Sequence, residues 1–425
     1  MNRSTARKCL APGTAVAPGE VLVATEVGDP ARGLLPCPAA PLIGGSLTRR
    51  GARIRYGPVP QCADASQADD GAVLFVTSAL HSDGGGTAIG AAADAVDGVA
   101  VAAARAAVEE WSAVVATRRL LGAVSPWCDG ARHAMERAAD TVAATDGPVY
   151  VAGQLAGTAQ ALARLAAAGA VFTGSLAEVP DGATVLIPAH GLPPSVLAEA
   201  AERQLTVVDA TCPLVAGVQE EARRFAGRGD QVVLIGQPGS AAVAGIAGQV
   251  PGRLVIAATS AGAAGVGAAD PRRVSYVLQP GIPVEDAAPV MASLRSRFPA
   301  LRGPDPDRFC YAASDRAETV RAVASACDVM LVLGEESHPD TRQVTGLARG
   351  GRAKVHVVAE AGQLTASWLA GTTAIGLADT VSATAGLAGD ITAALSGLGQ
   401  LSVTRRRVTT EITGQGTWSW PWSAG

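Results

Sequence analysis

Three cysteines occupy matching places in a segment that the chain uses three times. Each copy runs from a cysteine through an amphipathic helix pattern and an apolar strand pattern to a glycine. The copies cover residues 121–153, 207–236 and 308–334. From Cys128, Cys212 and Cys310 the distance to that glycine is 25, 24 and 24 residues. Such equal spacing predicts equivalent units of a pseudo-threefold body in which the three cysteines meet near one axis.

Three converging thiols form a ligand set that leaves one position of a bound metal centre open for chemistry. Thiolates are soft ligands that select iron–sulfur clusters or zinc. Each cysteine comes just before a predicted helix, where free N–H groups and the helix dipole favour the thiolate. The alternative is that all three are small buried core residues, as free cysteines often are. Their matched positions in three copies favour the ligand set.

The other cysteines follow no such pattern, and we predict structural roles for them. They are Cys9, Cys37, Cys62 and Cys327. The chain starts without the apolar core of a signal peptide, so we expect a cytoplasmic protein with reduced thiols. In that compartment a cysteine pattern indicates metal binding or catalysis more often than disulfides.

The elements that must position the cysteines are strands and helices in alternation. Residues 118–400 repeat strand, loop and helix, which predicts an α/β fold with mostly parallel sheets. Each copy is followed by a second strand pattern, at 183–191, 274–281 and 373–380. Ligands of open α/β sheets bind beyond the carboxyl ends of the strands. This rule predicts that six loops line the site: 153–158, 190–194, 237–245, 279–285, 335–341 and 379–384.

Composition limits the class of protein and of partner. The 425 residues are 48% hydrophobic and only 4% aromatic, and the net charge is −4. This length supports two or more domains with a sizeable core. Because no basic block is present, we expect neither a nucleic-acid nor an anionic membrane partner. No apolar stretch reaches the roughly 18 to 20 residues of a membrane-spanning helix.

The two ends of the chain differ from the repeated region. Residues 1–117 form a smaller α/β segment with predicted strands at 21–27 and 72–80 and a helix near 99–115. GEVLVATEV and the following PCPAAPLI resemble the C-terminal half of the nucleoside phosphorylase superfamily, without the half that carries its phosphate loop. We interpret the glycines at 84–86 as a plain loop. We expect the tail, residues 401–425, to pack on its own domain or to lack order rather than to bind a partner. It carries Trp418, Trp420 and Trp422.

Five motifs carry a second resemblance, over residues 118–400. They are SPWCDGARHAMERA, EVPDGATVLI, PAHG, DATCPLV and the pair RFPALRGP and FCYA. In order and spacing they resemble the 4-hydroxy-3-methylbut-2-enyl diphosphate reductase (IspH/LytB) family of isoprenoid biosynthesis. The resemblance implies three α/β subdomains, here 118–206, 207–305 and 306–400, around a [4Fe–4S] cluster. It also implies a two-electron removal of an allylic hydroxyl, with ferredoxin or flavodoxin as electron donor.

Carried onto this chain, the resemblance identifies ligands of the cluster and of the substrate. It implies that Cys128, Cys212 and Cys310 hold the cluster. His190 of PAHG matches a diphosphate-binding histidine, and Ser382 matches a diphosphate-binding serine. We therefore predict that both bind substrate and that His190 is also catalytic. The alternative for His190 is a packed, hydrogen-bonded histidine at a strand end.

Several matched positions depart from the family pattern. Gly157 and Ser240 stand in place of two further histidines, although we retain Ser240 as a predicted substrate-binding residue. The family motif HPEVEG reads SAAVAG here, so Ala242 replaces the catalytic glutamate. Pro280 and Gly281 replace a threonine pair near the iron.

The loop that should hold the diphosphate is acidic in this chain. His338, Pro339 and Asp340 stand where the family has Ser-Ser-Asn, and Glu335 and Glu336 precede them. A carboxylate about 4 Å from an anion costs on the order of 4 kcal/mol at an effective dielectric near 20. We predict replacement acids among the charged residues of these loops, the alternative being solvated loop charges. The candidates are Glu336, His338, Asp340 and Asp379.

These observations predict a [4Fe–4S] reductive dehydroxylase with an altered substrate or reduced activity. The substrate is expected to be an allylic alcohol that lacks a diphosphate or carries positive charge. One alternative is that the ordinary isoprenoid reaction persists in a rearranged pocket. The other is a non-catalytic iron–sulfur binding or redox-sensing protein.

Overall fold

The computed structural model describes residues 6–10, 15–29, 33–61, 69–80, 86–122 and 125–410. The chain forms two compact units, Met1–Pro126 with Thr319–Arg406, and Trp127–Glu318 with Arg407–Gly425. The first is called the N/C unit below and the second the cysteine unit, and each is described by itself. Some positions singled out in the sequence lie outside the described residues: the side chain of Cys9, Cys62, Gly84, Gly85, Trp418, Trp420 and Trp422.

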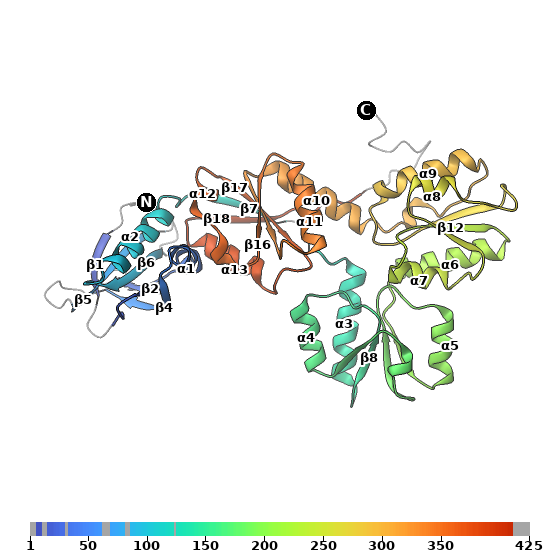
Figure 1. The fold of residues 1–425 in the computed structure, drawn as a ribbon, viewed down its shortest axis with the longest axis horizontal. Coiled ribbons are helices and arrows are strands. Elements are labelled where there is room, and N and C mark those ends of the chain that lie inside the picture. The colour runs from blue at the N-terminus through green and yellow to red at the C-terminus, as the bar shows by residue number, and fades with distance from the viewer. Residues whose placement is uncertain are drawn as a thin grey trace. The chain divides into compact units, whose positions relative to one another are not determined.

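The cysteine unit begins with a parallel sheet of strand order β11-β10-β8-β9 (Figure 1). Its strands are β8 (Val149–Ala152), β9 (Ala170–Thr173), β10 (Thr184–Ile187) and β11 (Thr206–Asp209). Its helices are α3 (Asp129–Ala144), α4 (Ala159–Ala167), the 3-10 helix η2 (Leu176–Glu178) and α5 (Pro194–Glu202). Helices α3 and α4 pack on one face of the sheet and α5 on the other, so both faces are covered.

A second parallel sheet of the cysteine unit has the order β13-β12-β14. Its strands are β12 (Gln231–Ile235), β13 (Leu254–Ala257) and β14 (Val274–Leu278). The helices are α6 (Pro213–Gly227), α7 (Ala241–Ala247), α8 (Ser260–Ala264), α9 (Val284–Arg297) and the 3-10 helix η3 (Pro306–Arg308). Helices α6 and α7 cover one face, and α8 and α9 cover the other. Helix α10 (Ala312–Ala326) begins here and ends in the N/C unit.

The N/C unit contains the third parallel sheet, with strand order β16-β15-β17-β7-β18. The strands are β7 (Arg118–Gly122), β15 (Val329–Leu333), β16 (Lys354–Val358), β17 (Ala374–Asp379) and β18 (Leu401–Arg405). The helices are α11 (Pro339–Arg349), η4 (Ala361–Gln363), α12 (Ala366–Leu369) and α13 (Leu387–Ser396). The α/β class with mostly parallel sheets is thereby confirmed.

Strand β7 lies in this third sheet, although the predicted first repeat of 118–206 begins with it. Leu120 is 1% and Leu121 5% exposed, so β7 is apolar on both faces and fits between two strands. It pairs with β17 and β18, and the first sheet of the cysteine unit begins only at β8. The domain boundaries of the sequence analysis remain predictions.

Residues 6–112 form a mixed sheet whose described strands follow the order β1-β5-β6-β2-β3, with β4 paired to β2. The strands are β1 (Ala6–Leu10), β2 (Glu20–Asp29), β3 (Gly33–Pro36), β4 (Arg53–Pro60), β5 (Asp69–Leu80) and β6 (Gly86–Asp94). The helices are α1 (Ala40–Arg49) and α2 (Gly98–Ser112). Strands β2 and β5 and helix α2 coincide with the predicted elements at 21–27, 72–80 and 99–115.

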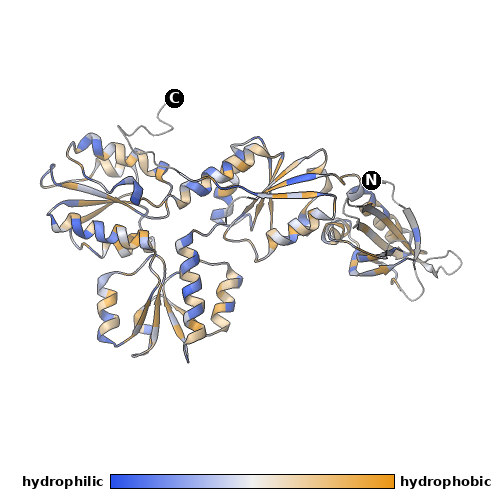
Figure 2. Ribbon diagram, turned by 180° about the vertical axis from the view of Figure 1, so that it is seen from behind, coloured by the Kyte–Doolittle hydropathy of each residue, from blue (hydrophilic) through white to orange (hydrophobic). Residues whose placement is uncertain are grey.

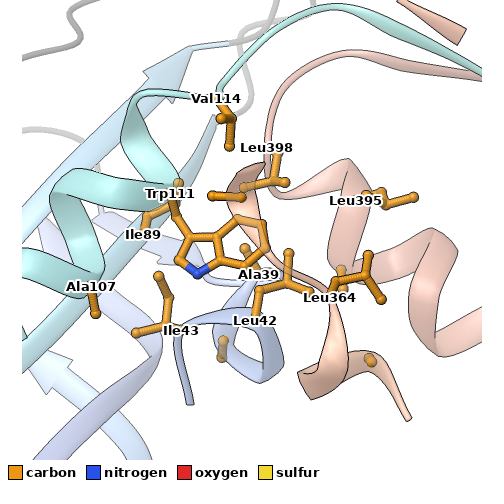
Figure 3. Packing of buried hydrophobic residues seen from close by; sticks show 14 of the residues in the cluster. Ala39, Leu42, Ile43, Ile89, Ala107, Trp111, Val114, Leu364, Leu395 and Leu398 are labelled. Atoms are coloured by element: carbon orange, nitrogen blue, oxygen red, sulfur yellow. The ribbon is translucent and has the colours of Figure 1, made fainter. Parts of the chain in front are cut away.

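One hydrophobic core joins this N-terminal sheet to the third parallel sheet (Figure 3). Trp111 of α2 is fully buried among Leu42 of α1, Leu364, and Leu398 after α13. The two segments also touch through backbone, because a Cβ on Gly45 would collide with the carbonyl of Gly362. Arg49 donates hydrogen bonds to the carbonyl oxygens of Gly362 (2.6 Å) and Leu364 (3.0 Å). The N-terminal segment is therefore integral to the N/C unit.

Figure 2 shows apolar residues concentrated along the central strands of each sheet. Strand β15, inside the third sheet, and strand β14, at the edge of the second, are buried at every residue, as expected for parallel strands covered on both faces. Among the described residues, none of the helices has the length and apolar character needed to cross a membrane.

Candidate metal centre

Cys128 is the N-cap residue of α3. Its backbone is extended (φ −71°, ψ 166°), and its Sγ accepts a hydrogen bond from Ala131 N at 3.4 Å. An N-cap directs its side chain at the unpaired N–H groups of the first turn. Cys128 is exposed, so its sulfur is available to a ligand.

Cys212 is the N-cap residue of α6, and Pro213 starts that helix with a φ that suits it. The backbone N–H of Cys212 donates to the carbonyl of Ala189 at 2.9 Å. This bond fastens the cysteine to the PAHG segment, where Ala189 precedes His190. The DATCPLV and PAHG motifs are thus neighbours in the fold.

Cys310 lies between η3 and α10 and is half-buried. Its pKa is raised, mainly by burial and further by the charges of Cys128 and Cys212. Hydrogen bonds from the backbone N–H groups of Ala312 and Gly281 oppose the rise. The N–H groups at the helix start thus favour the thiolate of Cys310, as expected, but they do not set the net direction of its pKa. Burial and like charge outweigh the N–H donors.

Glycine 130 brings two of the cysteines together. A Cβ on Gly130, in the first turn of α3, would lie 2.6 Å from Cys212 Sγ and 2.9 Å from Cys212 Cβ. A side chain there would collide with Cys212, so the absence of one lets the starts of α3 and α6 meet. Cys128 and Cys212 flank this contact from the two helix starts.

The cysteine unit carries three sulfur donors, whose chemistry suits a metal centre. Among the described residues, no three His, Cys, Asp or Glu side chains converge closely enough to hold one metal ion. Soft sulfur donors select iron–sulfur clusters or zinc, and in a cluster each thiolate takes its own iron. The close approach of Gly130 to Cys212 and the N–H groups that bond Cys310 fit three cysteines serving as such ligands.

His190 follows β10, in the loop that Cys212 fastens. The residue is exposed, yet desolvation by the surrounding protein lowers the pKa of its imidazole. The loop turns at Gly191, which has a φ of +67° that favours glycine. A Cβ on Gly191 would also lie 2.8 Å from Gln219 Nε2, so the end of that side chain would have to move to admit a larger residue. Desolvation therefore favours the neutral form of His190, in the loop that is bonded to Cys212.

Three positions of the cysteine unit depart from the family motifs, and each is packed or hydrogen-bonded within the protein. A Cβ on Gly157 would collide with the terminal methyl of Met135. Ser240 is the N-cap of α7, and its Oγ accepts a hydrogen bond from Val243 N at 3.2 Å. Ala242 is 2% exposed, in the core beside Val243. Gly157 and Ala242 offer no side-chain donor to an anion, and the Ser240 oxygen already accepts a bond from the start of α7.

Gly281 has a φ of +89°, which explains why a non-glycine residue is disfavoured there. Before it, Gln279 accepts a hydrogen bond from Gln237 N at 2.7 Å. The loop after β14 is thus tied to the loop after β12. Both are among the loops predicted to line the site.

In the N/C unit, the predicted loops 335–341 and 379–384 form a closed hydroxyl cluster. The Ser382 hydroxyl accepts from Glu335 N (2.9 Å) and lies 2.9 Å from Thr341 Oγ1 and 3.1 Å from Thr380 Oγ1. Thr380 is 1% exposed and donates to the carbonyl of Leu333 at 2.6 Å. Gly334 leaves the room that this cluster occupies, since a Cβ there would collide with Ser382.

The predicted acids of these loops are partly engaged. His338 is the N-cap of α11, and its Nδ1 accepts from Asp340 N at 3.2 Å. Asp340 accepts from Val381 N at 2.8 Å, which ties the two loops together. Glu335 and Glu336 are exposed. The catalytic and substrate-binding roles of these residues remain predictions.

The comparisons with known proteins agree with the motifs. The family model described as LytB protein matches residues 120–396, more than half of the chain. The chain belongs to the LytB family. It is 36% identical to 4-hydroxy-3-methylbut-2-enyl diphosphate reductase 2 of Mycobacterium bovis over 296 residues, which cover 69% of this chain and 90% of that protein. The reductase of Phenylobacterium zucineum is 35% identical over 61% of this chain and 82% of its own length.

Two solved structures share the LytB fold with this chain. The E-1-hydroxy-2-methyl-but-2-enyl-4-diphosphate reductase of Plasmodium falciparum superposes with a TM-score of 0.59 and 21% identity, over 72% of this chain and 96% of its own. A solved (E)-4-hydroxy-3-methyl-but-2-enyl diphosphate reductase superposes with a TM-score of 0.54 and 24% identity, over 66% of this chain and 99% of its own. The LytB fold therefore occupies the region after the N-terminal segment.

The structure of this LytB chain adds residues that the sequence analysis missed. Gly130 and Met135 became visible only through their spatial neighbours. Gln219 is buried at 8% exposure, and its Nε2 has no hydrogen-bond partner among the described residues. Ser314 donates to Glu285 at 2.6 Å and accepts from Val284 N at 2.9 Å, which pins the loop after β14 to α10. The sequence contains one signal that could have identified Met135 and Gln219. Each follows its cysteine by seven residues, which is about two turns of a helix.

Proposed function

We propose that this LytB chain is a [4Fe–4S] reductase that removes the hydroxyl of an allylic alcohol lacking a diphosphate. Cys128, Cys212 and Cys310 would hold the cluster. When bound, a three-cysteine cluster supplies electrons at low potential and one Lewis-acidic iron without a protein ligand. The remaining steps fall to the residues around the cysteines.

The proposed reaction is balanced with an external electron donor. The carbon–oxygen bond of the allylic alcohol breaks, a carbon–hydrogen bond forms, and water leaves. Two electrons come from a low-potential carrier of the ferredoxin or flavodoxin class, and two protons come from the site and solvent. We place this reaction in the cytoplasm, where such carriers and reduced thiols occur.

The residues of the chain would hold the alcohol and its protons. The neutral imidazole of His190 can accept a hydrogen bond from the hydroxyl or donate one to it. Ala242 removes the glutamate expected as proton donor, and a positioned acid is worth about 10²–10⁴-fold in rate. Glu336, His338 and Asp340 are our candidate replacements.

One observation carries the altered substrate: polar side chains at the predicted diphosphate positions are oriented by hydrogen bonds within the protein. Ser240 caps α7, Ser382 closes a hydroxyl cluster, and His338 caps α11. Releasing each of these groups for a ligand would forfeit about 0.5–1.5 kcal/mol of hydrogen bonding. The exposed carboxylates of Glu335 and Glu336 further oppose an anion. These facts support a substrate without phosphate.

The test is Mössbauer spectroscopy on anaerobically reconstituted, iron-57-enriched protein. The spectrum is recorded alone, with 4-hydroxy-3-methylbut-2-enyl diphosphate, and with the free diol of the same carbon skeleton. We expect one distinct iron whose signal shifts with the diol and not with the diphosphate. A shift with the diphosphate alone would contradict the altered substrate. A spectrum without a cubane would contradict the reductase.

Turnover separates the reductase from a redox-sensing protein. With chemically reduced methyl viologen as electron donor, the diol should yield a methylbutenol and water. The His190→Ala variant should retain the cluster and lose turnover. A cluster that cycles between oxidation states without converting any allylic alcohol would favour the sensor.

A further inference from the structure

We infer that Met135 is a specificity-determining residue, selecting substrates with a hydrocarbon chain where the family substrate carries its diphosphate. The inference rests on the proposed function and names the substrate class. Three observations carry it: the contact of Met135 with Gly157, the place of Met135 below Cys128, and the apolar surroundings of that contact.

The first observation is the contact between Met135 and Gly157, in which the methionine methyl group takes the place of a side chain at position 157. Gly157 lies in the loop between β8 and α4, at the carboxyl end of a parallel strand. The Met135 Cε atom occupies the space that a Cβ on Gly157 would fill. Met135 is only half-buried, and an unbranched thioether adapts readily to the shape of its neighbours. The methyl can therefore move to admit an apolar group.

Met135 lies on the face of α3 that carries Cys128. Seven residues separate the two, so they share a face two turns apart, about 10 Å along the helix axis. A substrate whose hydroxyl lies at the cysteine centre would reach Met135 with its opposite end. That opposite end is the group by which allylic alcohols of this class differ.

The surroundings of the contact are apolar. Leu162 would lie 3.3 Å from a Cβ on Gly157, and Leu162 and Met135 both pack against the core of the first sheet. Leu155 of the same loop is 6% exposed and belongs to that core. The oxygen of the Thr158 hydroxyl faces the start of α4, accepting from Ala161 N at 3.2 Å. The side chains of this wall are therefore ones that a hydrocarbon group packs against.

The test compares equilibrium binding of two probes to the cluster-loaded full chain, without reductant. One probe is (E)-2-methyloct-2-en-1-ol, and the other is 4-hydroxy-3-methylbut-2-enyl diphosphate. Both carry the same allylic alcohol end, so they differ in the group that would reach Met135. We expect wild-type protein to bind the octenol more tightly than the diphosphate. Met135→Ala should weaken octenol binding about tenfold, as expected for losing contact with about two methylene-sized groups.

The matched control is Leu165→Ala, which opens the same core from α4. It should leave both affinities unchanged, and iron content reports whether each variant is folded and loaded. Equal octenol affinity in Met135→Ala and wild type would overturn the inference, as would tighter binding of the diphosphate by wild type.

If Met135→Ala fails to load iron, Met135→Leu replaces it. This variant should change the ratio of the two affinities by less than about twofold to threefold, since a volume-conserving swap keeps the apolar contact. A larger loss of octenol preference with leucine would contradict an apolar role. Octenol binding that depends on Met135 without any turnover would overturn the proposed reaction and leave this inference standing.

Discussion

The cysteine helix starts and the substrate loops of this chain have diverged to different degrees. At or beside the starts of α3, α6 and α10 lie three cysteines, a glycine without room for a side chain and two N–H groups that bond Cys310. In the loops, serine and histidine side chains are engaged in caps and in a hydroxyl cluster. If our proposal holds, the difference teaches that a metal centre and its substrate pocket can change independently. The centre depends on helix starts, which the fold fixes, and the pocket depends on loop side chains, which the fold tolerates in many forms.

The largest expected effect is on the cysteine centre itself. Cys212→Ser should abolish cluster retention, because the remaining two thiolates cannot hold a cubane against exchange. Iron content and visible absorbance after anaerobic reconstitution measure it. Cys327→Ala is the control, since Cys327 is fully buried in the core of the third sheet. Full cluster retention in Cys212→Ser would show that the three cysteines do not form one centre.

The second effect concerns the core that joins the N-terminal segment to the third sheet. Trp111→Ala removes a fully buried indole and should lower the free energy of unfolding of the N/C unit by about 3–5 kcal/mol. Chemical denaturation followed by circular dichroism measures this change. Iron content at low temperature should remain that of wild type, because all three cysteines belong to the other unit. Loss of iron would mean that the two regions are less independent than we argue.

The third expected effect concerns the contact between the starts of α3 and α6. Gly130→Ala places a Cβ against Cys212 and should cost about 1–3 kcal/mol through overpacking, with several-fold weaker retention of the cluster. The control is Gly217→Ala, within α6, where a Cβ would meet no atom within 4 Å. That variant should gain up to about 1 kcal/mol from helix propensity. Identical iron retention in the two variants would remove Gly130 from the metal centre.

The smallest effect is the pH dependence set by His190. Its pKa is lowered by desolvation, so the unfolded chain binds the proton first as the pH falls. Stability attributable to His190 should therefore be complete above about pH 6.5. It should decline as the pH falls from there through the lowered pKa of the folded state. Denaturation midpoints of wild type and His190→Gln between pH 5 and 7 measure this, and the variant should show the shallower slope. Equal slopes would place His190 in a fully hydrated environment.

Much of the fold was predictable because it rests on local pattern. Apolar strands, helix starts with Pro213 or Thr158, and the cysteine-to-glycine repeat each depend on a few neighbouring residues. The sheet to which β7 belongs was not predictable in this way. Its residues suit a central strand of any sheet, and only long-range packing assigns it to β17 and β18.

The candidate site was predictable in residue type but not in the state of its side chains. Ser240 and Ser382 match ligand positions, yet sequence could not reveal that one caps a helix and the other closes a hydroxyl cluster. The contact of Met135 with Gly157 joins α3 to the loop after β8, and no spacing rule connects the two. Gly130 illustrates the same point, since its role is visible only beside Cys212.

The position of β7 has a consequence for synthesis of the chain on the ribosome. Arg119 pairs with Ala374, and Arg118 with Leu401. The sheet around β7 is therefore complete only after β18, the last described strand, has been synthesised. Trp111 is likewise buried only after Leu364 and Leu398 have been synthesised. Contacts this distant in sequence slow folding through the entropy of loop closure. The nascent N-terminal segment therefore exposes apolar surface while residues 127–318 are being made, and its folding is completed only after residues 364–405 have been synthesised.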